Sequence, residues 1–267
     1  MKMGYTSLGP QVRRPRGFGV LRALGRLGSG LGLMATLSTC GPGHRDDCLK
    51  SNGKVVTQRR DVAPGLLTVT AFDNVDLRLV QDGQTYAEVR AGENMQEDIE
   101  FKRTGDALEI TNTSRCNWTR RYDTPREVTL HVPRILNVFL RGQGNGSTVG
   151  EFAQDTIFFH LIGAGNLDLN LRATQVYLDL YELGDVTLRG STQGLNFVLG
   201  GTGRLYAQQF DVRQCYFDLT RDSNGDARVR ATNALGGTVR GSGTLYYSGR
   251  PVFTDIRVTG RGRAQPE

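Results

Sequence analysis

Residues able to perform acid–base or metal chemistry are few in this chain of 267 residues. The three histidines, His44, His131 and His160, are far apart and lack the short spacing of metal-binding motifs. No serine or cysteine nucleophile motif accompanies them. The acidic residues remain, and carboxylates clustered on one face would indicate polysaccharide cleavage. Whether they cluster depends on the elements that position them.

The four cysteines have different expected roles. Cys48 and Cys116 flank the first strand-rich stretch, and an oxidising compartment would permit a disulfide between them, although the spacing leaves their pairing open. Cys215 lies in "QCYFDL", in step with Phe217 and Leu219, which indicates a small buried apolar side chain. We expect no metal site, no cofactor and no catalytic residue.

Residues 1–39 have the features of a secretory signal. They are basic at first and uncharged from residue 27 to 39, a stretch shorter than the roughly 20 residues that span a bilayer. Leu37-Ser38-Thr39-Cys40 resembles a bacterial lipobox, so we expect Cys40 to be acylated and to begin the mature chain. Residues 40–54 then form a tether. The alternative is an ordinary signal peptide that is cut nearby and leaves Cys40 unmodified.

The net charge of +6 comes from this leader. Its six basic residues, taken from a total of 33, leave 27 basic residues against 27 acidic ones. A neutral domain lacks the basic surface that binds nucleic acid, so we expect no nucleic-acid partner.

Glycine pairs recur along the second half of the chain. They are Gly142 and Gly144, Gly163 and Gly165, Gly201 and Gly203, Gly241 and Gly243, and Gly260 and Gly262, with degenerate copies at Gly184 and Gly225. The second glycines are separated by 21, 19, 19, 22, 18 and 19 residues. This is a repeat of about 20 residues.

Each repeat alternates apolar and polar residues with period two, which indicates strands with one buried face. Val176, Leu178 and Leu180 share one face, and Tyr177 and Tyr181 share the other. No run of helical period follows the leader. An all-strand repeat of this length predicts a right-handed parallel β-helix, a β-solenoid, whose turns have three sides of about 20 Å.

We predict one domain over residues 55–267. Residues 141–263 form the Gly-x-Gly repeats, and residues 55–140 form a less regular β portion that caps the coil. The glycines are expected at the corners, where positive φ or close approach of neighbouring turns excludes a side chain. A phosphate-binding loop is excluded because a strand, and no helix, follows each glycine pair.

Aligning the repeats on the second glycine predicts two outward columns. The residue after the glycine gives Asn145, Asn166, Asp185, Arg204, Asp226, Thr244 and Arg263. Two residues further on, the column reads Asp168, Thr187, Tyr206, Arg228 and Tyr246. Acids in these columns are single and mixed with bases, which indicates a solvated face. Tyr177, Tyr181, Tyr206 and Tyr246 are candidate binding residues, although tyrosine is also common at exposed strand positions without a ligand.

The order of these motifs resembles a known family, the putative auto-transporter adhesin, head GIN domain. The likeness covers about residues 49–263. It includes the junction "VPRIL" (132–136), the copies "RGQGN", "IGAGN" and "RGSGT", and the closing segment "YYSGRPVFTDIRVTGRGR" (246–263). The resemblance implies an exported β-helix lipoprotein of the cell envelope.

We therefore expect an exported outer-membrane lipoprotein that presents its β-helix for binding or adhesion without catalysis, with the choice between the periplasmic side and the cell surface left open. The ligand would be a glycan or a protein, and the oligomeric state is open. The alternative is a β-helix enzyme acting on envelope or extracellular polysaccharide.

The lipobox-like segment yields a direct prediction. Mass spectrometry of the membrane fraction should find a mature chain that begins at an acylated Cys40. Replacing Cys40 with Ala should move the protein to the soluble fraction. A soluble wild-type chain that begins at another residue would contradict the anchor.

Overall fold

The computed structural model describes residues 51–114 and 123–267, which belong to one compact unit. The leader, Cys40, Cys48 and Cys116 lie outside the described residues. Among the residues that are described, no helix is long and apolar enough to cross a membrane.

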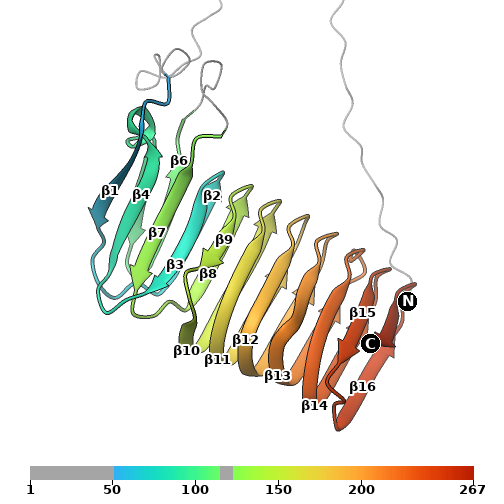
Figure 1. Cartoon of the computed structure of the whole chain (residues 1–267). Helices are drawn as coiled ribbons and strands as arrows, with labels where there is room; N and C mark the ends of the chain where they lie inside the picture. The colour runs from blue at the N-terminus through green and yellow to red at the C-terminus, as the bar shows by residue number, and fades with distance from the viewer. Residues whose placement is uncertain (1–50, 115–122) are drawn as a thin grey trace, which may run out of the picture. The chain divides into compact units, whose positions relative to one another are not determined.

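The described chain is built almost entirely of strands, which confirms the all-β solenoid (Figure 1). One short 3₁₀ helix, η1 (Glu93–Met95), interrupts them. The strands are β1 (Val55–Asp61), β2 (Thr68–Asp73), β3 (Asp76–Gln81), β4 (Tyr86–Gly92), β5 (Ile99–Thr104), β6 (Ala107–Asn112), β7 (Arg126–Val132), β8 (Asn137–Gly142), β9 (Gly146–Thr148), β10 (Phe152–Gly163), β11 (Leu167–Leu180), β12 (Val186–Leu199), β13 (Leu205–Leu219), β14 (Ala227–Val239), β15 (Thr244–Ser248), β16 (Phe253–Val258) and β17 (Arg263–Pro266).

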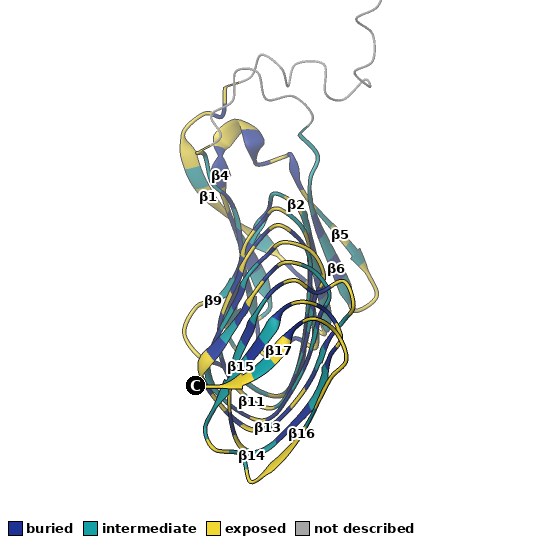
Figure 2. Cartoon of the chain, turned by 90° about the vertical axis from the view of Figure 1, so that its right-hand side faces the viewer, coloured by how far each residue is buried: buried dark blue, intermediate teal, exposed yellow. Residues whose placement is uncertain are grey.

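Each turn is flattened into two faces, where the sequence had led us to expect three sides (Figure 2). A single strand such as β11 supplies both faces, because it bends near Arg172–Thr174 without leaving the ladder. We call this bend the bend edge, and the opposite edge, which carries the glycine pairs, the glycine edge. Face A is the outward side of β7, β3, β9, the first halves of β11–β14, β15 and β17. Face B is the outward side of β6, β2, β8, the second halves of β10–β14, and β16.

The N-terminal portion joins the same stack, but in a different order from the sequence. β2 pairs with β6 on one side and β8 on the other, and β3 lies likewise between β7 and β9. The β2–β3 turn is therefore inserted between two turns that follow it in the chain. Antiparallel strands then end both sheets, with β4 and β1 beyond β7 and β5 beyond β6. These strands form the predicted cap.

The parallel register places like side chains on one another through the core. Leu161, Leu180, Leu199, Leu219 and Val239 are successive partners, and each is at most 2% exposed. Apolar stacking of this kind buries surface in every turn, at roughly 25 cal/mol per Å² removed from water.

Close approach of neighbouring turns explains the glycine column. A Cβ atom on Gly243 would lie 1.9 Å from the carbonyl oxygen of Gly225, and one on Gly225 would lie 1.8 Å from that of Gly203. The same relation holds along the whole column, whose members are Gly144, Gly165, Gly184, Gly203, Gly225, Gly243 and Gly262. The degenerate copies at Gly184 and Gly225 thus occupy regular places.

Positive φ explains only part of the pattern. Of the ten predicted corner glycines, Gly142 (φ 143°) and Gly163 (φ 149°) have a conformation that favours glycine. Gly243 does not, so of the two explanations expected for the corners only close approach applies there. The backbone of the preceding turn leaves no room for a side chain at this position.

This packing predicts the effect of a single added methyl group. Gly243→Ala should lower the free energy of unfolding by about 1–3 kcal/mol, because the turns must separate to admit the Cβ. Gly83→Ala is the matched control, since nothing lies within 4 Å of its Cβ position. Urea denaturation followed by circular dichroism measures both. Equal midpoints for the two variants would contradict the close-approach explanation.

Candidate binding surface

The column after the second glycine forms a ladder of hydrogen bonds along the glycine edge. Asn145 Oδ1 accepts from the Asn166 backbone N–H (3.0 Å), and Asn166 Oδ1 accepts from that of Asp185 (2.9 Å). Asp185 Oδ1 accepts in turn from the Arg204 N–H (2.8 Å). The ladder breaks at Arg204, whose side chain has no acceptor, and resumes where Asp226 accepts from Thr244 (2.8 Å).

These acids and amides therefore hold neighbouring turns together. Asp185 and Asp226, the two acids of this column, each accept a hydrogen bond from a backbone N–H through one carboxylate oxygen. A side chain with an oxygen two bonds beyond Cβ has the right length for this contact. The arrangement explains why short acids and amides occupy the column, and it gives them a structural role.

The second predicted column lies on face A with the expected register. Asp168, Thr187, Tyr206, Arg228 and Tyr246 are successive partners. The Arg228 guanidinium lies 4.4 Å from the centre of the Tyr246 ring, and its Nε lies 3.4 Å from the Glu267 carboxylate. Tyr206 and Tyr246 are thus separated by a charged side chain that one of the two rings already contacts.

Aromatic residues gather on face B. Phe158 and Tyr177 are stacked with their ring centroids 4.4 Å apart and their planes 9° from parallel. Asn196 follows Tyr177 in the same column, and Tyr216 follows Asn196. Tyr216 is 48% exposed and lies against Gly236. A small polar residue therefore lies between two tyrosine rings.

A neighbouring column on face B supplies charge. His160 stacks on Phe139 with the centroids 4.2 Å apart, and its Nδ1 lies 2.9 Å from an Asp179 carboxylate oxygen. Asp218 lies in the same column as Asp179, two turns further along. It accepts a hydrogen bond from Arg240 Nε (3.0 Å). The two columns line a shallow hollow of about 440 Å³. We call this hollow the aromatic slot, lined by Phe158, His160, Tyr177, Asp179, Asn196, Phe197, Val198, Tyr216, Phe217 and Asp218.

Tyr181 lies at the margin of the aromatic slot. Its ring covers Gly200, where a Cβ would lie 2.7 Å from the Tyr181 Cδ1 atom. Partial burial raises the pKa of Tyr181, and the nearby Asp179 and Asp218 raise it further. The structure therefore divides the four predicted tyrosines, with Tyr177 and Tyr181 on face B and Tyr206 and Tyr246 on face A.

Aligning the repeats on their second glycine did not predict most of the aromatic slot, because only the residues that follow each glycine were compared. Phe158, Tyr177 and Asn196 each precede the second glycine of their repeat by seven residues. Tyr216 precedes Gly225 by nine residues, because its corner is two residues longer. Counting backward would have found the first three residues, and the longer corner hides Tyr216.

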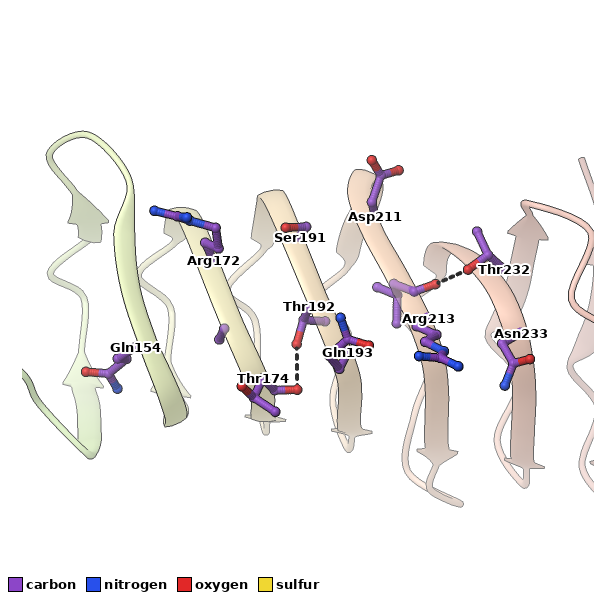
Figure 3. Close-up of a pocket in the computed structure, with 12 residues that line it drawn as sticks. Gln154, Arg172, Thr174, Ser191, Thr192, Gln193, Asp211, Arg213, Thr232 and Asn233 are labelled. Carbon is purple, nitrogen blue, oxygen red and sulfur yellow. Dashed lines mark hydrogen bonds between the residues drawn. The ribbon is translucent and has the colours of Figure 1, made fainter.

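A second hollow, of about 570 Å³, follows the bend edge (Figure 3). Its lining is polar, and part of this polarity serves the backbone. Thr192 Oγ1 donates to the carbonyl oxygens of Gly194 (3.0 Å) and Thr174 (3.3 Å), and Thr232 Oγ1 donates to that of Val212 (3.3 Å). This polar groove has hydrogen-bonding capacity but no aromatic ring.

Other candidate chemistry is not supported by the geometry. No group of three or more His, Cys, Asp or Glu side chains could hold a metal ion in residues 51–114 and 123–267. His131 lies on face A between Tyr86 and Asp82, away from His160. Cys215 is free and buried, which confirms the predicted buried position, and burial raises the pKa of its thiol to about 12.

The fold and these surfaces define the class of protein. It is a β-solenoid with two solvent-exposed faces, on each of which outward side chains from successive turns form columns. The family model described as putative auto-transporter adhesin, head GIN domain, matches residues 67–251, and the chain belongs to this family.

Solved structures share the fold. A crystal structure of a putative adhesin from Bacteroides fragilis aligns with a TM-score of 0.74 and 19% identity, covering 82% of this chain and 100% of that one. A putative lipid binding protein from Parabacteroides distasonis aligns with a TM-score of 0.63 and 17% identity, over 82% and 100% of the two chains. A putative adhesin from the same organism gives 0.61 and 18%, over 81% and 99%. Among proteins with curated descriptions, none matches this chain.

The ladder on the glycine edge can be tested by one substitution. Asn166→Ala should cost about 0.5–1.5 kcal/mol of stability, because the Asp185 N–H loses its acceptor. Asn166→Asp keeps an oxygen at the same position and should cost much less. Urea denaturation of both variants measures the difference. An Asn166→Ala variant as stable as the wild type would contradict the structural role of the ladder.

Proposed function

We propose that this protein is an adhesin-like β-solenoid that is anchored outside the cytoplasm and binds a neutral glycan in the aromatic slot of face B. The observation that carries the proposal is the gap between Tyr177 and Tyr216, with Asn196 as its floor. The family name and the adhesin-like relatives support the general role.

The dimensions of the slot suit a flat sugar ring. Tyr177 and Tyr216 are two turns apart, about 10 Å at the usual strand spacing. Stacked rings have their centroids about 4.5 Å apart or more, so one ring fits between the two tyrosines. The apolar face of a pyranose can stack on tyrosine as an aromatic ring does.

Charge in the slot indicates the kind of glycan. Asp179 and Asp218 line the slot, and their carboxylate oxygens can accept hydrogen bonds from hydroxyl groups. The slot lining contains no Lys or Arg, and the neighbouring Arg240 is already paired with Asp218, so an acidic polysaccharide would lack an arginine or lysine partner there. A neutral glycan therefore fits better than an acidic one.

We propose binding without cleavage. A glycoside hydrolase needs one carboxyl group to donate a proton and a second to act as base or nucleophile. Asp179 is engaged with His160, and Asp218 is engaged with Arg240. This pairing supports a role in positioning hydroxyl groups.

The leader supports an anchored, exported protein. A lipid on Cys40 and the tether of residues 40–54 would hold the solenoid at the outer membrane, facing outward in our proposal. A short anchor of this kind leaves both faces accessible to a ligand.

Substitutions on the two faces test the slot. Glycan-array screening followed by calorimetry should find a neutral oligosaccharide whose affinity falls at least about tenfold in Tyr216→Ala, since loss of an aromatic anchor costs 1.4 kcal/mol or more. Asn196→Tyr should also abolish binding, because a third ring fills the gap. Tyr246→Ala, on face A, is the control and should bind normally.

Two results would contradict the proposal. Equal loss of affinity in Tyr216→Ala and Tyr246→Ala would exclude a site on face B. Release of reducing ends from the bound glycan, abolished by Asp179→Asn, would instead establish an enzyme.

A further inference from the structure

The two ends of the solenoid differ in how they close the core. At the N-terminal end, Met95 and Ile99 are at most 1% exposed beneath the antiparallel strands. At the C-terminal end, the inward side of the last turn is open. Val258 is 47% exposed, whereas its partner one turn earlier, Val239, is fully buried.

Further apolar surface surrounds this open end. Val252 is 70% exposed and Phe253 is 68% exposed where the chain enters β16, and Ile256 faces inward within this strand. β16 pairs only with β14, and β17 pairs only with β15, within the described part of the chain. Both strands therefore present a free edge together with an exposed apolar interior, which is a surface that another strand can extend.

The register identifies which backbone groups of β16 are free. Thr259 N–H donates to Val239 O (2.9 Å), so the odd-numbered residues of β16 point toward β14. In a parallel ladder, alternate residues point to opposite sides. Thr254, Ile256 and Val258 consequently present their N–H and C=O groups at the free edge.

The outward side chains of β16 are complementary in charge to those of a second, antiparallel copy of the same strand. Asp255 and Arg257 flank Ile256, and no ion pair within the described chain is formed by either. If two copies of β16 run antiparallel about Ile256, Asp255 of each copy faces Arg257 of the other. Thr254 then faces Val258, and the free backbone groups of both strands pair with each other.

We propose that this C-terminal end binds the same end of a second copy of the chain, with β16 pairing antiparallel to β16 about Ile256. The contact is isologous, so it closes as a two-fold dimer and does not propagate into a fibre. It extends the sheet of β16 into the second copy and covers the inward side of the last turn at Ile256 and Val258.

The geometry bears on adhesion in a way that rests on the proposed function. An end-to-end dimer places the two N-terminal caps at opposite extremes. If each copy is anchored through its N-terminal tether, the dimer joins two surfaces, and the protein is then a homophilic adhesin. Dimerisation itself does not depend on the glycan site or on the lipid.

Sedimentation velocity of the full chain tests the dimer. Cys40→Ser and a reducing agent remove association through a lipid or a disulfide. The Cys40→Ser chain without further substitutions should sediment as a dimer over a concentration series. Asp255→Arg should weaken association at least about tenfold, because each copy then opposes arginine to arginine.

A charge swap distinguishes the contact from a folding effect. Asp255→Arg combined with Arg257→Asp should restore the dimer, since the complementary pairs are re-formed in reverse. Asp155→Arg, an exposed acid on β10, is the matched control and should leave the dimer intact. A monomeric wild-type chain, or a swap variant that stays monomeric while folded by circular dichroism, would overturn the proposal. Tyr216→Ala should dimerise normally, so failure of the glycan site and failure of the dimer are separable.

Discussion

The contact that the rest of this structure depends on is the approach of one backbone turn to the next at the glycine edge. The carbonyl oxygen of Gly165 occupies the space where a side chain on Gly184 would lie, and the relation repeats at Gly203 and Gly225. Because only glycine fits, the corners stack directly on one another. That stacking sets the register of the strands on both sides, and the register in turn places leucine on leucine inside and column on column outside.

A fixed register separates the task of folding from the task of binding. The inward residues and the glycine edge supply the packing, and the amide ladder through Asn145, Asn166 and Asp185 reinforces it. Outward positions on the two faces contribute less to this packing, so their side chains can form a surface suited to a ligand. On face B they form the aromatic slot, with Tyr177 and Tyr216 as its walls. On face A, Arg228 occupies the corresponding place between Tyr206 and Tyr246.

A solenoid of this kind must also manage its ends. Antiparallel strands β4, β1 and β5 close the core at one end, where Met95 and Ile99 are buried. The other end leaves Val258 and the edge of β16 open. The asymmetry is physically informative, since exposed apolar surface beside an unpaired edge favours association. The cap and the open end are formed by different kinds of strand pairing, and only the cap is complete within the described chain.

The sequence by itself determined the repeat, the solenoid, the burial of Cys215 and the shared column of Tyr206, Arg228 and Tyr246. These features are local, because a strand that directly follows a glycine keeps a constant count from it. Only the tertiary structure decided the insertion of the β2–β3 turn between later turns, since that pairing joins strands far apart in the chain. It also decided that Tyr216 lines a slot with Tyr177. The corner between Tyr216 and Gly225 is two residues longer than its neighbours, so counting residues from the glycine does not align Tyr216 with Tyr177 and Asn196. The pairing of the strands does place it in their column.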